Sequence, residues 1–436
     1  MEKINTEALG QRTVRKIMIR ILPFVMFLYV IAQIDRVNIG FAALDMNAEL
    51  ALSAEVFGLL SGIFFIGYFL FEVPSNMVLH KFGARMWIAR IMITWGIIVV
   101  LTGFVQSATH LYILRFLLGV AEAGFLPGIV LYLTYWFRKK ERAIATSILL
   151  LAIPISSIIG APVSTLIMDM VQWGNLSGWR WMFILEGLPA VILGIVVLKY
   201  LINNPKDAKW LSKEESDWLI TELEKERNED KLVNKATKKE MLKDGRVWQL
   251  TLLYFTNYTA MFGLSFWLPT IIKSLSENGS TNLQIGWLSI IPALIGIPAN
   301  LIMGWNASRT NSHRGHLIFA FIISIIGFAA SGFASSSVMM IVLLSFSAIG
   351  LYGFMGVFFA YMTFFFTENT APVGIALVNS FASIGGFIGP NIFGLVTAQS
   401  GMFILSGLSV IGAIMVIILK PKKVTIKTPI TVEINN

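Results

Sequence analysis

The sequence contains no cysteine, only four histidines and few charged residues. The absence of cysteine excludes disulfide scaffolds, thiol catalysis and thiolate metal sites. No two histidines are four residues apart, so a histidine-built metal site is not expected. Charged residues make up 14% of the 436 residues, against about 25% in a typical soluble protein. The chain therefore lacks the polar surface of a water-soluble enzyme, and we predict an integral membrane protein that needs no cofactor.

Hydrophobic residues are abundant instead, at 56% of the chain, and they gather in long runs. A helix needs about 20 apolar residues to cross the hydrocarbon core of a bilayer. Twelve runs meet this requirement, over residues 18–40, 55–79, 84–105, 111–137, 143–168, 181–202, 247–272, 284–304, 316–334, 338–366, 372–397 and 400–420. The first run is longer than the core of a signal peptide, about 7–15 residues, so we expect it to be retained.

The runs fall into two groups of six, which predicts an all-α membrane protein with two pseudo-symmetric six-helix bundles. The expected divisions are an N-terminal bundle, a cytoplasmic linker, a C-terminal bundle and a cytoplasmic tail, over residues 1–202, 203–245, 246–420 and 421–436. The linker has ten Lys/Arg and eleven Asp/Glu residues, so the positive excess of the chain lies elsewhere. Within it, Ser212 and Glu215 form a capping-box pattern ahead of an amphipathic helix.

Lysine and arginine residues occupy the connections on one side of the predicted membrane, including residues 138–142 and 420–427. The other side holds little beyond Arg180 and Lys273. Because cytoplasmic loops carry the excess of basic residues, both termini and the linker are predicted to be cytoplasmic. The expected location is the plasma or inner membrane. The net charge of +9 then reflects the membrane topology and does not indicate binding to nucleic acid. The expected partners are the lipid bilayer and a small substrate, and the protein is expected to be a monomer.

Two basic loops occupy corresponding places in the two halves. Residues Asn76–Arg85 follow the second run and Gly304–Arg314 follow the eighth. Paired halves of this kind are typical of transporters built from repeats. The pattern resembles the major facilitator superfamily, although the acidic position of that family's loop motif is His80 in one half and Ser308 in the other.

Five further stretches resemble one branch of that family, the anion:cation symporters, which includes tartrate, phthalate, hydroxyphenylacetate and sugar-acid permeases. They are IDRVNIGFA (34–42), LRFLLGVAEAGFLPG (114–128), WRWMFILEGLPA (179–190), NPKDAKWLSKEE (204–215) and FWLPTIIK (266–273). The resemblance implies import of a small organic anion by proton symport. The same fold working as an anion exchanger or a sodium-coupled carrier is the alternative. A membrane enzyme is not expected, since no nucleophile with a base and no ligand cluster is present.

A charged side chain at the bilayer centre costs about 2.5–3.5 kcal/mol on insertion scales. Each such residue is therefore expected to have a functional or structural role. The first six runs hold Asp35, Arg36, Glu72, Arg115, Glu122 and Glu186, whereas the last six hold no acidic residue in the interior of any run. Arg36 and Arg115 carry forked donors that match a carboxylate. We expect them to bind substrate, with Asp35 and Glu122 as proton-coupling residues. The resemblance implies the same roles, through an Asp-Arg pair on the first helix and an Arg/Glu pair on the fourth.

Other polar residues complete the predicted site. Tyr68 shares a helical stripe with Glu72, and the second half is expected to contribute Asn379 and Ser380. Further candidates in that half are Asn257, Tyr258, Tyr352 and Tyr361. The alternative is that these residues form static ion pairs and interhelical hydrogen bonds. Glu186 is interpreted as structural, with Arg180 as its candidate partner. The two arginines suit tartrate, a sugar acid or an aromatic carboxylate alike.

Overall fold

The computed structural model describes residues 2–231, 238–276, 280–362, 364–366 and 371–419, so the predicted tail lies outside the described residues. These residues form nineteen α-helices and one short 3-10 helix, with no strand among them. The helices that precede the linker are α1 (Glu2–Val37), α2 (Ile39–Glu49), α3 (Ala54–Phe82), α4 (Ala84–Thr102), α5 (Ala108–Glu122), α6 (Phe125–Thr134), α7 (Lys139–Leu150), α8 (Ala152–Met170) and α9 (Gly178–Tyr200). The linker contains η1 (Pro205–Asp207), α10 (Lys213–Lys231) and α11 (Lys238–Lys243). The helices that follow are α12 (Gly245–Leu275), α13 (Asn282–Ser289), α14 (Ile291–Thr310), α15 (His313–Ser331), α16 (Ser337–Met362), α17 (Ala371–Ala382), α18 (Gly385–Leu395) and α19 (Ala398–Ile418).

The long helices reproduce the predicted apolar runs. Eleven continuous segments of the described residues are long and apolar enough to cross a membrane. The twelfth predicted span, 247–272, is helix α12, which is 31 residues long but is not among these eleven segments. Its polar side chains, among them Thr256, Asn257 and Thr259, are buried against neighbouring helices. A helix surrounded by protein need not be apolar enough to dissolve in lipid, which explains the difference.

Several spans are broken near their middle, and two of the breaks matter for the site. Asn38 separates α1 from α2, and Ala123 and Gly124 separate α5 from α6. Gly124 has φ of +86°, a left-handed conformation that glycine adopts without strain. The carbonyl of Ala123, released from the helix by the break, accepts a 2.6 Å hydrogen bond from the Ser75 hydroxyl. The breaks therefore keep their freed backbone groups satisfied inside the bundle.

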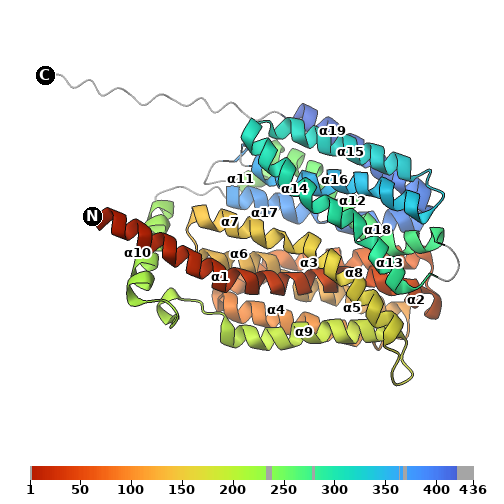
Figure 1. The fold of residues 1–436 in the computed structure, drawn as a ribbon, viewed down its shortest axis with the longest axis horizontal. Helices are drawn as coiled ribbons and strands as arrows, with labels where there is room; N and C mark the ends of the chain where they lie inside the picture. The colour runs from red at the N-terminus through yellow and green to blue at the C-terminus, as the bar shows by residue number, and fades with distance from the viewer. Residues whose placement is uncertain (1, 232–237, 277–279, 363, 367–370, 420–436) are drawn as a thin grey trace.

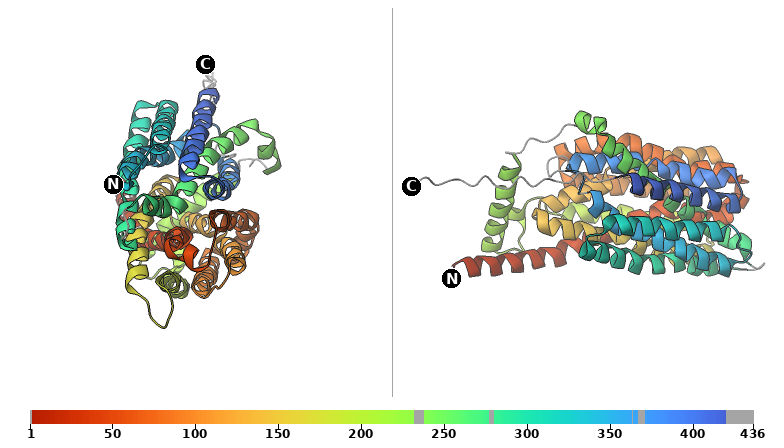
Figure 2. Two further views of the ribbon diagram at one scale, coloured as in Figure 1. Left: turned by 90° about the vertical axis from the view of Figure 1, so that its right-hand side faces the viewer. Right: turned by 90° about the horizontal axis from the view of Figure 1, so that it is seen from above.

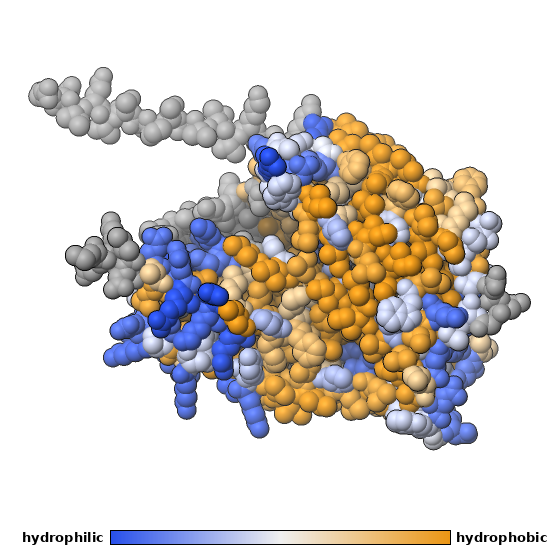
Figure 3. Space-filling model, in the orientation of Figure 1, coloured by the Kyte–Doolittle hydropathy of each residue, from blue (hydrophilic) through white to orange (hydrophobic). Residues whose placement is uncertain are grey.

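The helices form two groups that lie side by side. Figure 1 shows α1–α9 together in red to yellow and α12–α19 together in green to blue. The start of α1 and the linker helix α10 lie at one end, which we call the terminal end (Figures 1 and 2). We call the opposite end, which includes the C-terminal ends of α2 and α12, the far end. An apolar belt separates the polar residues of the two ends (Figure 3), and it includes exposed side chains such as Ile192 and Ile302.

Helix α10 is fixed to the first group of helices at the terminal end. The predicted capping box is confirmed, since the Ser212 amide donates to Glu215 at 2.9 Å and the Glu215 amide donates to the Ser212 hydroxyl at 3.2 Å. The buried Glu215 carboxylate also pairs with Lys16 and Arg12 of α1, at 2.8 and 3.1 Å. Burial opposes ionisation of Glu215, but these hydrogen bonds outweigh it and lower the pKa below its usual range.

Candidate functional site

The predicted site has a buried ion pair at its centre. Arg36, in the last turn of α1, donates from Nη2 to Oε1 of Glu122, the last residue of α5, at 2.6 Å. The Arg36 side chain is 8% exposed and that of Glu122 is 3% exposed. Each partner is therefore the main charge compensation of the other. Both residues adjoin the helix breaks described above, so the backbone near the pair is not locked into one continuous helix.

Aromatic rings enclose the two predicted arginines. The guanidinium carbon of Arg36 lies 5.2 Å from the ring centroid of Phe64 and 5.3 Å from that of Tyr68. The guanidinium carbon of Arg115 lies 5.4 Å from the Phe64 ring and 5.9 Å from the Phe266 ring. A cation near an aromatic face is stabilised by the ring quadrupole, and the rings also exclude water. The ring of Phe64 therefore lies close to both guanidinium groups.

Arg115 is fully enclosed, yet it has no carboxylate partner among the described residues. It is 1% exposed, and the bond that its Nη2 makes is a long one, 3.4 Å, to the carbonyl oxygen of Arg36. Its Nε and Nη1 have no hydrogen-bond partner among the described residues, and the same is true of Nε of Arg36. Buried donors are nearly always satisfied in proteins, so unsatisfied guanidinium groups suggest the place of an anion. Glu122, which lies on the same span as Arg115, forms its ion pair with Arg36 of the first span.

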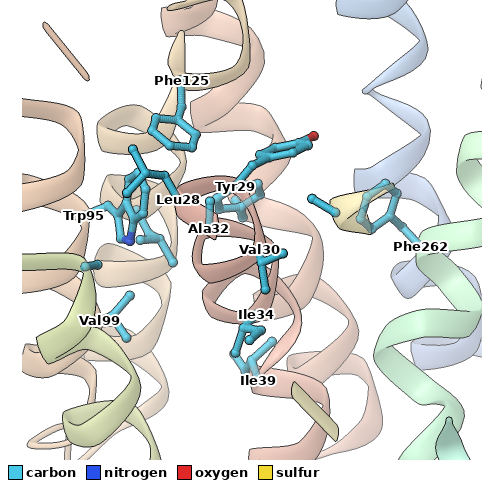
Figure 4. Packing of buried hydrophobic residues seen from close by; sticks show 14 of the residues in the cluster. Leu28, Tyr29, Val30, Ala32, Ile34, Ile39, Trp95, Val99, Phe125 and Phe262 are labelled. Carbon is cyan, nitrogen blue, oxygen red and sulfur yellow. The ribbon is translucent and has the colours of Figure 1, made fainter. Parts of the chain in front are cut away.

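Asp35 faces away from this pair. Its Oδ2 accepts a 2.9 Å hydrogen bond from the indole of Trp95 on α4, while Oδ1 has no partner among the described residues. Figure 4 shows Trp95 on one side of α1 and Phe262, from α12, on the other. Asp35 therefore lies inside the first group of helices. The arginine beside it in sequence is paired with Glu122, so the side chains of Asp35 and Arg36 point in different directions.

Tyr68, on α3, lies toward the second group of helices, to which the predicted residues Asn379 and Ser380 of α17 belong. Tyr68 contacts Arg36 through its ring, as described above. The Ser380 hydroxyl donates to Oε2 of Glu72 at 2.5 Å, which joins α17 to α3. Asn379 is half-buried beside it. In this conformation Ser380 is thus engaged with Glu72, and a substrate would have to compete for it.

Glu186 belongs to a separate polar cluster. Its Oε1 accepts from the Ser164 hydroxyl at 2.6 Å and its Oε2 accepts from the Asn38 side-chain amide at 3.0 Å. Arg180, its predicted partner, instead bonds to Glu49 at 3.0 Å at the far end. The predicted pairing is therefore wrong, because the arginine side chain extends toward the loop and not along its own helix.

The remaining candidates of the second half are held by structural contacts. Asn257 donates to the carbonyl of Leu351 at 3.3 Å, and Tyr361 donates to the carbonyl of Leu419 at 3.1 Å. The ring of Tyr258 packs against that of Phe262 with centroids 4.6 Å apart. These contacts match the alternative that the sequence left open, interhelical packing.

The far end is closed by contacts between the two groups of helices. Asp45 Oδ1 lies 3.4 Å from Nζ of Lys273, and Asp45 Oδ2 accepts from the side-chain amide of Asn282 at 2.7 Å. Asp169 accepts from the backbone amide of Leu283 at 2.8 Å. Small residues bring the backbones together, since α18 packs directly on α3. The far end therefore offers no open route to the buried pair through these contacts.

Two cavities lie between the groups of helices. The access cavity, of about 500 Å³, separates α7 and α8 from α14 and α16 and reaches the exposed side chains of Ile144 and Trp305 near the terminal end. The interface cavity, of about 70 Å³, lies deeper, between the α1–α2 junction, α8 and α12. Met261 and Tyr352 line both cavities, so the two adjoin. The access cavity thus lies toward the terminal end, away from the contacts that join the two groups of helices at the far end.

Comparisons with known proteins agree with this geometry. The family model described as Major Facilitator Superfamily matches residues 25–280 and 271–433. The chain belongs to the Major Facilitator Superfamily. An Agrobacterium vitis protein named for tartrate transport is 43% identical over 94% of this chain and 95% of its own. A quinolone resistance transporter of Acinetobacter baumannii is 39% identical, over 94% and 95% of the two chains. A solved structure of a bacterial homolog of the human lysosomal transporter Spinster has a TM-score of 0.76 at 16% identity, covering 91% of this chain and 96% of that one.

Membership of the Major Facilitator Superfamily makes this a multi-pass membrane transporter of a small molecule and not an enzyme. No group of three or more His, Cys, Asp or Glu side chains in the described part of the chain is placed to hold a metal ion. Sequence reasoning missed Phe64, Phe266 and the Asn38–Glu186 contact. Asn38 stands two residues after Arg36 in a stretch that resembles the anion:cation symporters, and this position was the available signal that sequence reasoning did not use.

Proposed function

We propose that this transporter imports a small organic anion, a carboxylate, together with a proton by alternating access. The observation that carries the proposal is the buried pair of Arg36 and Glu122 beside the unpaired guanidinium of Arg115. A carboxylate substrate and the Glu122 carboxylate are chemically alike. They compete for the same arginine donors, and this competition supplies a coupling mechanism without bond chemistry.

The coupling follows from the charges. When Glu122 is ionised it occupies Nη2 of Arg36, and a substrate carboxylate is left with Arg115 and the remaining donors. A proton on Glu122 cancels its charge and releases Arg36. Both guanidinium groups then hold the substrate carboxylate through charge-assisted hydrogen bonds. After the substrate leaves, Glu122 loses its proton and recovers Arg36, which restores the starting pair. Asp35, buried nearby with one free oxygen, is the second candidate for proton binding.

We assign the terminal end to the cytoplasm. The basic residues at that end, including Arg138 and Arg314, follow the rule that cytoplasmic loops are positively charged. The access cavity then opens to the cytoplasm, and the described conformation is inward-open. A relative of 43% identity that is named for tartrate transport supports a carboxylate substrate. An anion exchanger or a sodium-coupled carrier would use the same arginines, and only the coupling ion differs.

The substrate site is tested by Arg36→Lys in purified protein, with affinities measured for a panel of carboxylates. Lysine keeps the charge but loses the planar fork, so affinity should fall by about tenfold or more. The matched control is Arg180→Lys, which alters an arginine paired to Glu49 at the far end and should leave affinity unchanged. Unchanged affinity in well-folded Arg36→Lys protein would assign Arg36 to the scaffold and refute the proposed site.

The orientation is tested separately with tags. Tags at either terminus, or within residues 225–240, should be reached only from the cytoplasm, whereas a tag at Ser276 should be reached only from outside. Labelling of the two termini from opposite sides would contradict a topology with an even number of spans. Proton coupling is measured by substrate accumulation in vesicles with an imposed pH gradient, and accumulation driven by a sodium gradient alone would favour the sodium-coupled alternative.

A further inference from the structure

Glu186 is a buried carboxylate that the proposed coupling does not use. It is 7% exposed, and both of its hydrogen-bond donors are uncharged: the Ser164 hydroxyl bonds to Oε1 at 2.6 Å, and the Asn38 side-chain amide bonds to Oε2 at 3.0 Å. Its expected partner, Arg180, pairs with Glu49 instead. An ionised carboxylate is costly to bury without a cation, so a group in this position tends to bind a proton.

The described helices around Glu186 supply no cation that compensates its charge. Helix α9 packs against α1, α2, α4 and α8. On α1, Asp35 is itself a carboxylate and is bonded to Trp95 of α4, while Arg36 is paired with Glu122. The other described charged residues of these five helices lie toward the terminal end, in α1 before residue 21 and at Arg85, Arg90 and Lys199, or toward the far end, at Asp45, Glu49, Asp169 and Arg180.

Both partners of Glu186, Ser164 and Asn38, line the interface cavity. Asn38 is 1% exposed, its Nδ2 is directed to Glu186, and its Oδ1 has no partner among the described residues. A buried acceptor of this kind calls for a donor. The cavity, of about 70 Å³, exceeds the roughly 10–15 Å³ that one water molecule needs, and its serine oxygens offer water further partners. Water in the cavity can therefore reach both groups that hold Glu186.

Ser164 can carry a proton between the cavity and Glu186, because a hydroxyl group both donates and accepts hydrogen bonds. A proton that arrives from water bonds to the Ser164 oxygen, and the hydroxyl hydrogen that it replaces passes to Oε1 of Glu186 along the 2.6 Å contact. The reverse transfer returns the proton to water. Asn38 donates to the other oxygen of Glu186 throughout, so no helix has to move for the proton to bind.

We infer that Glu186 is a proton-binding site, distinct from the pair of Arg36 and Glu122, that is reached from the interface cavity through Ser164. The inference goes beyond the proposed function, because proton binding at Glu186 requires no substrate.

The cavity makes this site sensitive to the movement of the helices. Its lining comes from the α1–α2 junction and α8 of the first group and from α12, α13, α14 and α16 of the second. In the described conformation it adjoins the access cavity at Met261 and Tyr352. When the two groups close on each other, water leaves the cavity, and an ionised Glu186 loses solvation that a protonated one does not need. Protonation of Glu186 therefore favours the movement, and exchange of substrate should become faster as the pH falls.

Proton binding is tested directly by infrared difference spectroscopy of the purified protein without substrate. Spectra are taken from about pH 8 to about pH 5, where ordinary carboxyl groups stay mostly ionised. The difference between the wild type and Glu186→Gln should contain the carbonyl band of a protonated carboxyl group, and this band should grow as the pH falls. Ser164→Ala keeps the carboxyl group but removes its 2.6 Å partner, so the band should shift in frequency.

The effect on movement is tested by tartrate counterflow in proteoliposomes with the same pH on both sides. The background is Glu122→Gln, which removes the pH response of the pair with Arg36. The rate should rise by about threefold to tenfold between about pH 8 and about pH 5, since a cost of the size of one hydrogen bond is removed. The rise should be lost when Glu186→Gln is added. It should be retained with the matched control Glu49→Gln, which changes a carboxylate at the far end.

Each other outcome has a distinct meaning. A band that is absent from the difference at every pH overturns the inference, because Glu186 then stays ionised. A band of constant size at every pH also overturns it, because Glu186 then holds its proton permanently. Either result leaves the proposed function standing. Failure of the wild type to bind or exchange any acid of the carboxylate panel refutes the proposed function, whereas the infrared result still decides whether Glu186 binds a proton.

Discussion

Replacing Glu122 with glutamine separates substrate binding from proton coupling. Glutamine keeps the size of the side chain and an oxygen that faces Arg36, but it removes the negative charge. If Glu122 competes with the substrate for Arg36, the variant resembles the protonated transporter permanently. We expect it to bind carboxylates and to catalyse counterflow, but not to concentrate substrate when a proton gradient is imposed.

The size of the effect follows from the contact that is lost. The bond between Arg36 and Glu122 is 2.6 Å long and is buried at both ends. Hydrogen bonds to charged groups contribute about 1.5–3 kcal/mol, so removing this competitor should tighten carboxylate binding at neutral pH by about tenfold to about a hundredfold. The same change leaves Arg36 buried with weaker compensation. Loss of one partner of a buried pair costs up to about 3–5 kcal/mol, so a lower melting temperature is also expected without substrate.

The sign of the pH dependence is fixed by the same competition. In the wild type, a falling pH adds a proton to Glu122 and releases Arg36, so carboxylate affinity should rise. In Glu122→Gln no proton can bind at this position, so affinity should be high and nearly independent of pH. The assay is calorimetric binding of one carboxylate across a pH series in which that carboxylate stays ionised.

The control for this experiment is a second Glu–Arg pair in the same protein. Glu49 pairs with Arg180 at 3.0 Å at the far end, away from the site. The variant Glu49→Gln should therefore retain the pH response of the wild type. If Glu122→Gln still concentrates substrate with a normal pH response, Glu122 is not the coupling residue. Asp35 then becomes the residue to test.

Two further predictions concern the ends of the molecule. Asp45→Ala removes the contacts to Lys273 and Asn282. A cysteine introduced at the far end should then react up to about fivefold faster with a membrane-impermeant thiol reagent. The expected factor is small because the Asp45 and Lys273 side chains are each 40% exposed, and exposed ion pairs contribute about 1 kcal/mol or less. Unchanged labelling would show that apolar packing alone closes the far end. Glu215→Gln should release α10 from α1, seen as faster amide exchange in α10 at neutral pH. Because the pKa of Glu215 is lowered in the folded protein, wild-type α10 should keep its protection until the pH falls below the usual pKa of a glutamate side chain, and protection that persists in stronger acid would contradict the role of this carboxylate.

The chain of twelve spans could be predicted from the sequence because the length of an apolar run is a local property. The ends of α3 and α9, for example, lie within a few residues of the predicted limits. The capping box at Ser212 and Glu215 was likewise predictable, since its two partners are three residues apart. Arg36, Arg115 and Glu122 could be singled out from the sequence, because a charged side chain is costly to place in a membrane span and is rarely found there without a role.

The tertiary structure alone decided which of these charges are partners. Arg36 and Glu122 are 86 residues apart, and Ser380 and Glu72 are 308 apart, so no local pattern relates them. Sequence reasoning paired Arg180 with Glu186, its neighbour on one helix, and was wrong because side chains of that length reach other elements. The breaks after Val37 and Glu122 depend on packing that the sequence pattern does not encode.

The interface cavity is also a product of the tertiary structure. Its serines look like ordinary helix residues in the sequence, and only the packing of α8, α12 and α13 brings them to one cavity. Asn38 was visible in a stretch shared with the anion:cation symporters, but the direction of its amide is set by Glu186 on another helix. Composition and periodicity determine which segments enter the membrane, because transfer into lipid depends on each segment by itself. Which donors and acceptors face one another depends on how the segments pack, and that packing decides what the transporter can bind.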